Sequence, residues 1–161
     1  MAKKIHHLEG FTIENEFTEI RLDLGRIENN VNAAQYWLDS MVMTSMVPFM
    51  PMDTGHFINV TKAMSAAIAG TGKVAAAAPP QGRFLYEGKT MVDMGTGSPW
   101  ARKGAKKVLV SEFGGKTEAK QNLNFSKSAH PSAQSHWFDA AKKKDCEKWV
   151  RDVKKIAGGG K

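Results

Sequence analysis

Residues 135–156 read SHWFDAAKKKDCEKWVRDVKKI, and this stretch decides the fold of the C-terminal part of the chain. Its apolar residues recur at the spacing of one helix face, while most lysines fall elsewhere around the helix. The pattern predicts an amphipathic helix, with Ser135 as its N-cap and the glycines at 158–160 ending it. The predicted apolar stripe comprises Phe138, Ala141, Cys146, Trp149, Val150, Val153 and Ile156.

The same stretch raises the question of a metal or thiol site, because it holds a histidine, acidic residues and the only cysteine. A zinc site needs three or four ligands that converge on one point. His136 and Asp139 could share a helix face, but Cys146 lies ~15 Å further along the helix than His136, and His130 precedes a proline in a loop. We therefore predict no metal, no cofactor and no enzymatic activity, with Cys146 as a buried structural thiol. A metal- or thiol-dependent hydrolase is the weaker alternative.

Length and composition indicate one globular domain. The chain has 161 residues, of which 42% are hydrophobic and 24% charged, so it is long enough to bury a core. No apolar run approaches the ~20 residues that span a bilayer, and the lysines near the N-terminus are not followed by the apolar core of a secretory signal. A single cysteine cannot form an intrachain disulfide, so we expect assembly in a reducing cytoplasm without a membrane partner.

The positive charge is concentrated in the second half of the chain. Residues 1–88 hold 7 Lys and Arg against 9 Asp and Glu, a net charge of −2. Residues 89–161 hold 16 against 7, a net charge of +9. Such a half attracts polyanions or the acidic face of a neighbour, although a solvated lysine-rich surface explains the pattern equally well.

The first half of the chain predicts a strand, a long helix and a hairpin. Ile20, Leu22 and Leu24 alternate with charged residues, which predicts a short half-buried strand. A helical period then runs from residue 26 until Pro48 ends it. Residues 47–55 read VPFMPMDTG, which predicts a rigid turn. Five methionines crowd this turn and the end of the helix before it, and we assign them to the core rather than to a partner surface; they are Met41, Met43, Met46, Met50 and Met52. Two runs within 56–78 flank Gly-Thr-Gly, which predicts a β-hairpin.

The second half begins with a glycine- and lysine-rich insertion at residues 89–121. The KVLV run at 107–110 predicts a strand inside it, and LNFS at 123–126 predicts a returning strand. A loop of this length in a compact domain is either functional or ordered by a partner. Its basic cluster either contacts DNA phosphates or is a solvated loop, and the candidate contacts are Arg102, Lys103, Lys106 and Lys107.

These elements predict an α+β fold, in which the long N-terminal helix and the C-terminal amphipathic helix pack on a small antiparallel sheet. We expect one domain over residues 1–161. It comprises an N-terminal arm (1–19), the strand, long helix and hairpin (20–88), the insertion arm (89–121), and the final strand and helix (122–161). The Asp53-Thr54-Gly55 triplet matches that of aspartic proteases, but such chemistry needs two carboxylates in one site, so a turn is favoured.

Three segments, taken in order, resemble the minor capsid protein family of tailed bacteriophages and, more loosely, the head–tail joining and tail-component proteins of long-tailed phages. They are PMDTGHF (51–57), FLYEGK (84–89) and NFSKSAHPSAQSHWFDAAK (124–142). The matching positions are Pro51, Asp53, Thr54 and Gly55, then Tyr86, Gly88 and Lys89, then Trp137, Phe138, Ala141 and Lys142. Gln81-Gly82 departs from the family pattern, which has Tyr-Ala there.

The resemblance implies a structural virion protein, assembled in the host cytoplasm and located at the head–tail junction. It implies self-association into a ring, a hexamer or a dodecamer, which contacts other neck, portal-side and tail proteins and through which DNA passes. The implied structural or interface residues are Pro51, Asp53, Thr54, Gly55, Tyr86, Gly88, Trp137 and Phe138, and the stripe residue Trp149 joins them. The alternative is a basic nucleic-acid-binding module, with residues 102–107 and 142–155 as its phosphate-binding surface.

Overall fold

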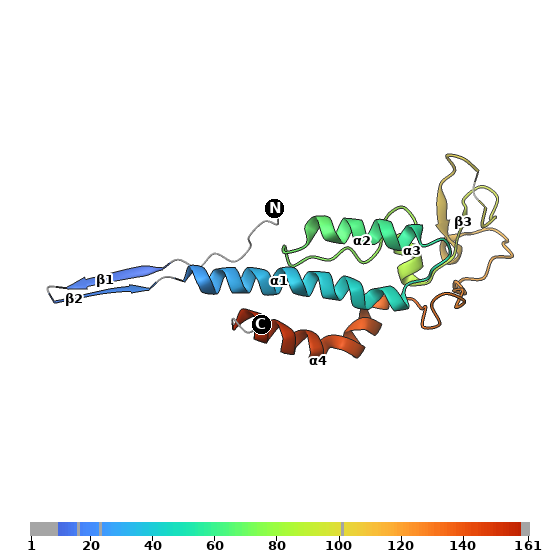
Figure 1. Cartoon of the computed structure of the whole chain (residues 1–161). Coiled ribbons are helices and arrows are strands. Elements are labelled where there is room, and N and C mark those ends of the chain that lie inside the picture. Colours follow the sequence, from blue (N-terminus) through green and yellow to red (C-terminus); the bar gives the residue numbers. More distant parts are fainter. Residues whose placement is uncertain (1–9, 16, 23, 101, 159–161) are drawn as a thin grey trace. The chain divides into compact units, whose positions relative to one another are not determined.

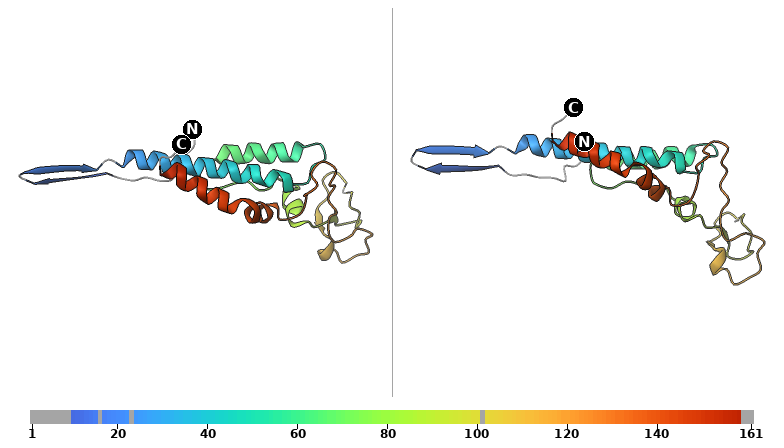
Figure 2. Two further views of the ribbon diagram at one scale, coloured as in Figure 1. Left: turned by 60° about the horizontal axis from the view of Figure 1, so that its bottom comes forward. Right: turned by 90° about the horizontal axis from the view of Figure 1, so that it is seen from below.

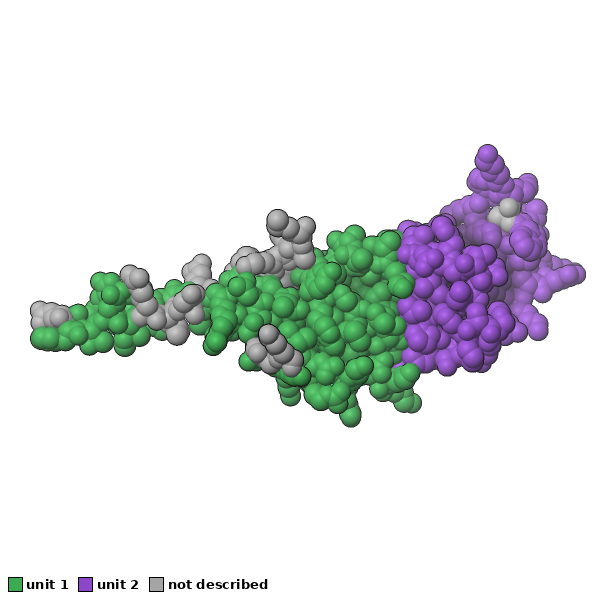
Figure 3. Space-filling model, in the orientation of Figure 1, with its two compact units in different colours: residues 1–45, 62–75, 141–161 green, residues 46–61, 76–140 purple. Residues whose placement is uncertain are grey.

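The computed structural model describes residues 10–15, 17–22, 24–100 and 102–158, and it has an α+β fold, as the sequence predicts. The chain forms two compact units, drawn in green and purple in Figure 3. Unit 1 comprises residues 1–45, 62–75 and 141–161, and unit 2 comprises residues 46–61 and 76–140. Helices α1, α2 and α4 each contribute residues to both units.

Unit 1 begins with a two-stranded antiparallel hairpin, in which β1 (Phe11–Asn15) pairs with β2 (Thr18–Leu22). The side chain of Asn15 makes the turn, because its Oδ1 accepts hydrogen bonds from the amides of Phe17 and Thr18. The strand predicted around Ile20 is therefore confirmed. It is not half-buried, because Ile20 is exposed, and Leu24 lies beyond its end. Strand β1 was not predicted.

Helix α1 (Gly25–Met46) is the predicted long helix, and a short 3-10 helix, η1 (Val47–Phe49), follows it at Pro48. Within unit 1, the later turns of α2 and most of α4 lie alongside α1 (Figure 1 and Figure 2). The buried apolar residues of this unit are Ala34, Val42, Met43, Ala69, Ala141 and Trp149. Met46 and Met50 are fully buried in unit 2, so the methionines there belong to the core.

Residues 56–78 do not form the predicted hairpin. Their first half is helix α2 (His56–Ile68), because its buried positions fall at helical spacing, on Ile58, Thr61, Ser65 and Ala69. The Gly-Thr-Gly run ends this helix instead of turning a hairpin. The chain then returns in an extended form, held by the hydroxyls of α2. The Thr61 hydroxyl accepts from the amide of Ala78 (3.1 Å), and the Ser65 hydroxyl donates to the carbonyl of residue 75 (2.9 Å).

Helix α4 (Trp137–Ala157) is the predicted amphipathic helix. It starts one residue later than the predicted cap implies, because His136 directly precedes it with a positive φ of 50°. Ser135 therefore lies outside the N-cap position. In unit 1, the Trp149 indole is buried and donates to the Ser45 hydroxyl of α1 (3.3 Å). Cys146 is half-buried rather than buried.

The insertion at 89–121 belongs to unit 2 and contains more structure than one strand. Strand β3 (Met91–Asp93) pairs antiparallel with β4 (Lys107–Leu109), which confirms the predicted KVLV strand, and the 3-10 helix η2 (Val110–Glu112) follows. The LNFS strand is absent from the described part of the chain. Only an isolated bridge between Lys89 and Asn122 forms there, and residues 123–126 are irregular. The short helix α3 (Gly82–Glu87) precedes the insertion.

Candidate assembly site

The centre of unit 2 is the side chain of Trp137, which is fully buried. Its indole N–H donates to the carbonyl oxygen of Ala76 (2.8 Å). The ring of Phe57 from α2 and the ring of Tyr86 from α3 both pack edge to face against it, with centroid distances of 6.0 and 4.9 Å. One aromatic side chain therefore joins the start of α4 to α2, α3 and the extended return segment.

Backbone contacts fix the same junction. The carbonyl of Tyr86 accepts from the amide of His136 (2.8 Å), which supports the left-handed backbone that His136 adopts before α4. Gly88 ends α3 with a φ of 65°, and a Cβ there would lie 3.0 Å from the Cβ of Ser135. Its carbonyl also accepts from Leu123 (2.9 Å). The FLYEGK segment is thus held against two later segments, around residues 123 and 135–136. The close approach of Gly88 to Ser135 favours glycine at this position.

Charges surround the outer side of this junction. The carboxylates of Glu87 and Asp139 lie 3.6 and 3.8 Å from the ring nitrogens of His136, and the His136 ring packs edge to face on Tyr86. Burial, followed by the negative charges of Asp139 and Glu87, raises the pKa of Tyr86 above its ordinary value. The phenol therefore stays protonated at neutral pH, and its ring packs against His136 and Trp137.

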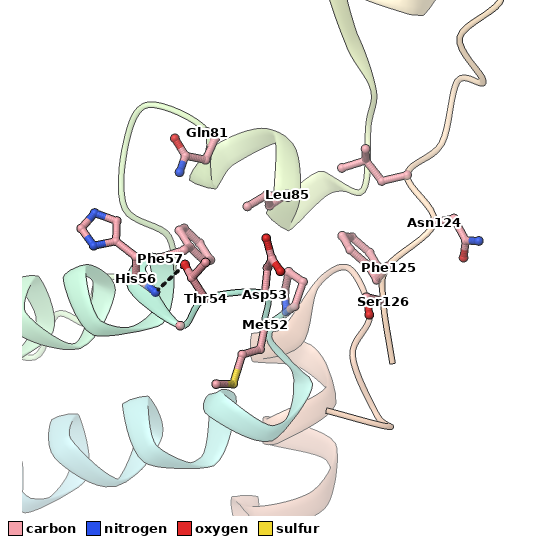
Figure 4. Close-up of a pocket in the computed structure, with 13 residues that line it drawn as sticks. Met52, Asp53, Thr54, His56, Phe57, Gln81, Leu85, Asn124, Phe125 and Ser126 are labelled. Carbon is pink, nitrogen blue, oxygen red and sulfur yellow. Dashed lines mark hydrogen bonds between the residues drawn. The ribbon is translucent and has the colours of Figure 1, made fainter. Parts of the chain in front are cut away.

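An open hollow of about 370 Å³ lies beside the junction (Figure 4). Its walls include the half-buried side chains of Phe57, Leu85 and Phe125. The turn that holds Asp53 and Thr54 forms its exposed rim, and Figure 4 shows the Asp53 carboxylate on the side that faces Leu85. An apolar hollow with one carboxylate at its edge is suited to bind an apolar side chain of a partner that has a hydrogen-bond donor next to it.

The insertion is organised by a buried carboxylate, Asp93, of which only 1% is exposed. Its Oδ1 accepts from the amides of Gly95 (2.7 Å) and Thr96 (3.2 Å), and its Oδ2 lies 3.4 Å from Nε of Arg102. The backbone hydrogen bond from Gly95 and then the guanidinium of Arg102 lower the pKa of Asp93 to about 2, while burial opposes them. The carboxylate is ionised at neutral pH and closes the β3–β4 loop.

The predicted residues fall into separate groups. Pro51, Asp53, Thr54 and Gly55 line the hollow, and Tyr86, Gly88 and Trp137 form the junction beside it. Phe138 is half-buried at the start of α4, and Trp149 belongs to unit 1.

The four candidate DNA contacts also differ from one another. Arg102 pairs with Asp93, and the amine of Lys107 donates to the carbonyl of Pro99 (2.9 Å). Lys103 and Lys106 are exposed. The basic cluster therefore contains residues that organise the loop as well as residues that face the solvent.

Two buried aspartates and one exposed apolar hairpin were not singled out from the sequence. Asp39 of α1 is buried, and its Oδ2 accepts from the amides of Gly70 (2.8 Å) and Gly72 (3.1 Å). Asp93 could have been found, because an aspartate two residues before a glycine in a loop is typical of a side chain that bonds its own turn. Asp39 could not, because the backbone amides that it binds lie more than thirty residues further along the chain.

Within the described ranges, no three His, Cys, Asp or Glu residues are grouped so that they could hold a metal ion. None of the helices in this part of the chain is both long and apolar enough to cross a membrane. No protein-family model, curated protein or solved structure matches the chain.

Proposed function

We propose that the chain is a structural virion protein of a tailed bacteriophage, which forms a ring at the head–tail connector through which DNA passes. The observation that carries this proposal is the convergence of three segments in unit 2. Phe57 of the PMDTGHF segment and Tyr86 of the FLYEGK segment both pack on Trp137 at the start of α4, and the carbonyl of Tyr86 accepts from the amide of His136. These are the three segments that, taken in order, resemble the phage family. Their convergence on one buried side chain supports that resemblance.

The chemistry of the buried carboxylates favours a structural role. The carboxylate of Asp39 accepts from backbone amides and from the side chain of Gln35. The carboxylate of Asp93 accepts from backbone amides and from the side chain of Arg102. All of these partners belong to the same unit as the aspartate that they bind. Groups used in this way hold loops in place and are not open to a substrate. An assembly protein needs such rigid loops, because subunits of a ring contact one another head to tail through surfaces of fixed shape.

The positive insertion supports a place near DNA. Lys103 and Lys106 are exposed in the loop between β3 and β4. A channel wall that DNA passes needs positive charge directed at phosphates, without side chains that read bases. Exposed lysines in a loop held by the Asp93–Arg102 pair meet this requirement.

The direct genetic test is a phage that carries this gene with a nonsense codon. In a non-suppressing host we expect separate heads and tails, with few joined particles in electron micrographs. Wild-type protein supplied in trans should restore joined, infectious particles. A chain with Trp137→Ala should restore few, because it disrupts the junction in unit 2, whereas Trp100→Ala, at a Trp that is 87% exposed, serves as the matched control. Normal particles without the protein would contradict the proposal.

A basic nucleic-acid-binding module is the second candidate, because Trp100 is exposed in the same loop as Lys103 and Lys106. Exposed aromatic rings stack on single-stranded bases, and lysines bind phosphates. A gel-shift titration at several salt concentrations separates the two functions. Submicromolar binding by the isolated chain, with a steep loss of affinity as salt rises, would favour the module. Weak binding that does not respond to Trp100→Ala would favour the ring protein.

A further inference from the structure

The β1–β2 hairpin presents an apolar face that nothing in the described part of unit 1 covers. The strand register places Ile13 opposite Ile20, and Phe11 opposite Leu22. Phe11, Ile13 and Ile20 are each about half exposed (53–54%), and Phe17 at the turn is 92% exposed. A two-stranded hairpin with a bare apolar face is only marginally stable in water. This face is therefore suited to burial against another surface.

The other face of the hairpin is acidic. Residues 10–22 contain three glutamates and one arginine. The register places Glu14 opposite Glu19, and the net charge of residues 10–22 is −2. A cationic surface would complement this charge. The charge pattern therefore disfavours DNA and an anionic lipid surface as the occupant, and it favours a protein surface with both apolar and cationic groups.

Unit 2 contains a groove with these two properties. It has a volume of about 680 Å³ and lies between α3 and the β3–β4 sheet. Its floor includes the half-buried side chains of Phe84, Leu85, Met91 and Leu123. The exposed residues Lys89 and Lys107 stand at its rim. Their ammonium groups each donate to a neutral oxygen, of Asn122 (3.0 Å) and of Pro99 (2.9 Å), which leaves their positive charge without a carboxylate in these contacts. The apolar floor of the groove matches the apolar face of the hairpin. The two ammonium groups at the rim match the glutamates on the opposite face of the hairpin.

We propose that the β1–β2 hairpin of one copy docks in this groove of a second copy of the chain. Phe11, Ile13 and Ile20 lie against the apolar floor, while Glu14 lies near the rim lysines. Because hairpin and groove are different surfaces, the contact is heterologous and leaves a free hairpin and a free groove at the two ends of a pair. The contact deepens the ring function proposed above, on which it rests, by naming the surfaces that join successive subunits.

Photocrosslinking of the full-length chain tests the contact. Benzoylphenylalanine replaces Phe11, and equal amounts of light and ¹⁵N-labelled chains are mixed before irradiation. We expect cross-links between light and heavy chains that map to residues 84–91 or 105–107. The same probe at Thr12, on the polar face, should give a several-fold lower yield. Cross-links within one chain, cross-links to other segments, or a chain that stays monomeric at every concentration would each overturn the proposal.

Charge reversal provides an independent readout in the same full-length chain. Glu14→Lys should weaken self-association measured by sedimentation, by roughly fivefold in the dissociation constant. Lys89→Glu added to that variant should restore the association. Lys142→Glu, at an exposed lysine of α4, has the same net charge change and should not restore it. Equal restoration by both second changes, or by neither, would overturn the groove assignment. The particle genetics above would still decide the ring function, so the two failures are distinguishable.

Discussion

The ring of Trp137 packs edge to face on the ring of Tyr86, with centroids 4.9 Å apart and ring planes at 86°. The two residues are separated by the whole insertion, so this contact closes unit 2 around it. Aromatic pairs of this geometry add ~0.5–1.5 kcal/mol to the free energy gained by burying their area. The contact also places the start of α4 directly against the end of α3.

Replacing Trp137 with alanine should strongly destabilise the isolated chain. A buried Trp→Ala change costs ~3–5 kcal/mol, which in a chain of this size lowers the melting temperature by about 6–20 °C. The indole also loses its hydrogen bond to Ala76. Phe138→Ala should have a smaller effect in the same direction, because Phe138 is half-buried.

Trp100→Ala is the matched control for this measurement in a calorimeter, because the Trp100 side chain is 87% exposed. We expect its melting temperature to stay within about 2 °C of the wild type, since exposed substitutions change stability by ~0.5 kcal/mol or less. An unchanged melting curve for Trp137→Ala would move that residue from the core to a partner interface.

Asp39→Ala should release the loop that follows α2. The change leaves the buried amide of Gly70 and the part-buried amide of Gly72 without their acceptor, and the loss at the buried amide alone costs ~1–3 kcal/mol. Hydrogen exchange followed by mass spectrometry should show faster exchange in residues 69–73. Asp53→Ala, at an exposed carboxylate, removes the same group without this effect. Equal protection in both variants would show that Asp39 does not hold the loop.

Gly88 and Gly104 form a matched pair for a glycine-to-alanine test. Both have positive φ, 65° and 80°, which costs ~1–2 kcal/mol for a residue with a Cβ. Only at Gly88 would the new Cβ meet a neighbour, Ser135, at 3.0 Å, whereas Gly104 has open space. Gly88→Ala should therefore lower the melting temperature more than Gly104→Ala. Adding Ser135→Gly should recover part of the difference, and no recovery would show that crowding is not the cause.

The Asp93–Arg102 loop should weaken in acid. The pKa of Asp93 is lowered from 3.8 to about 2 in the folded chain. Its ionised form therefore stabilises the fold above pH ~4, and this contribution is lost as the pH falls through about 2. Asp93→Asn should remove the part of the acid loss that occurs between these pH values, in melting temperatures measured from pH 2 to 5. An identical acid dependence in the variant would contradict the assignment.

The long helices were predictable because each repeats one apolar face over about five turns. Helix α1 and helix α4 both show this signal, and both were found within two residues of their ends. Trp137 was named as a structural or interface residue, and the structure buries it completely. The methionines around residue 46 were also assigned correctly to the core.

Helix α2 was missed because its apolar face is made of small and polar residues. Thr61 and Ser65 are buried there, and both form hydrogen bonds with the chain segment that returns beside them. The local sequence around α2 does not indicate that such a segment packs there. β-Branched residues and a Gly-Thr-Gly run then favoured a hairpin. The β1–β2 hairpin was missed for a related reason. Its apolar face is not buried within the described chain, so the usual link between apolar alternation and burial does not apply to it.

Immunogold labelling of purified phage particles, with an antibody against this chain, tests the central claim most directly. The ring function predicts gold at one position per particle, at the junction between head and tail, and no gold on particles from the nonsense mutant. Absence of the chain from purified particles, or label spread over the head surface or the tail tip, would contradict it.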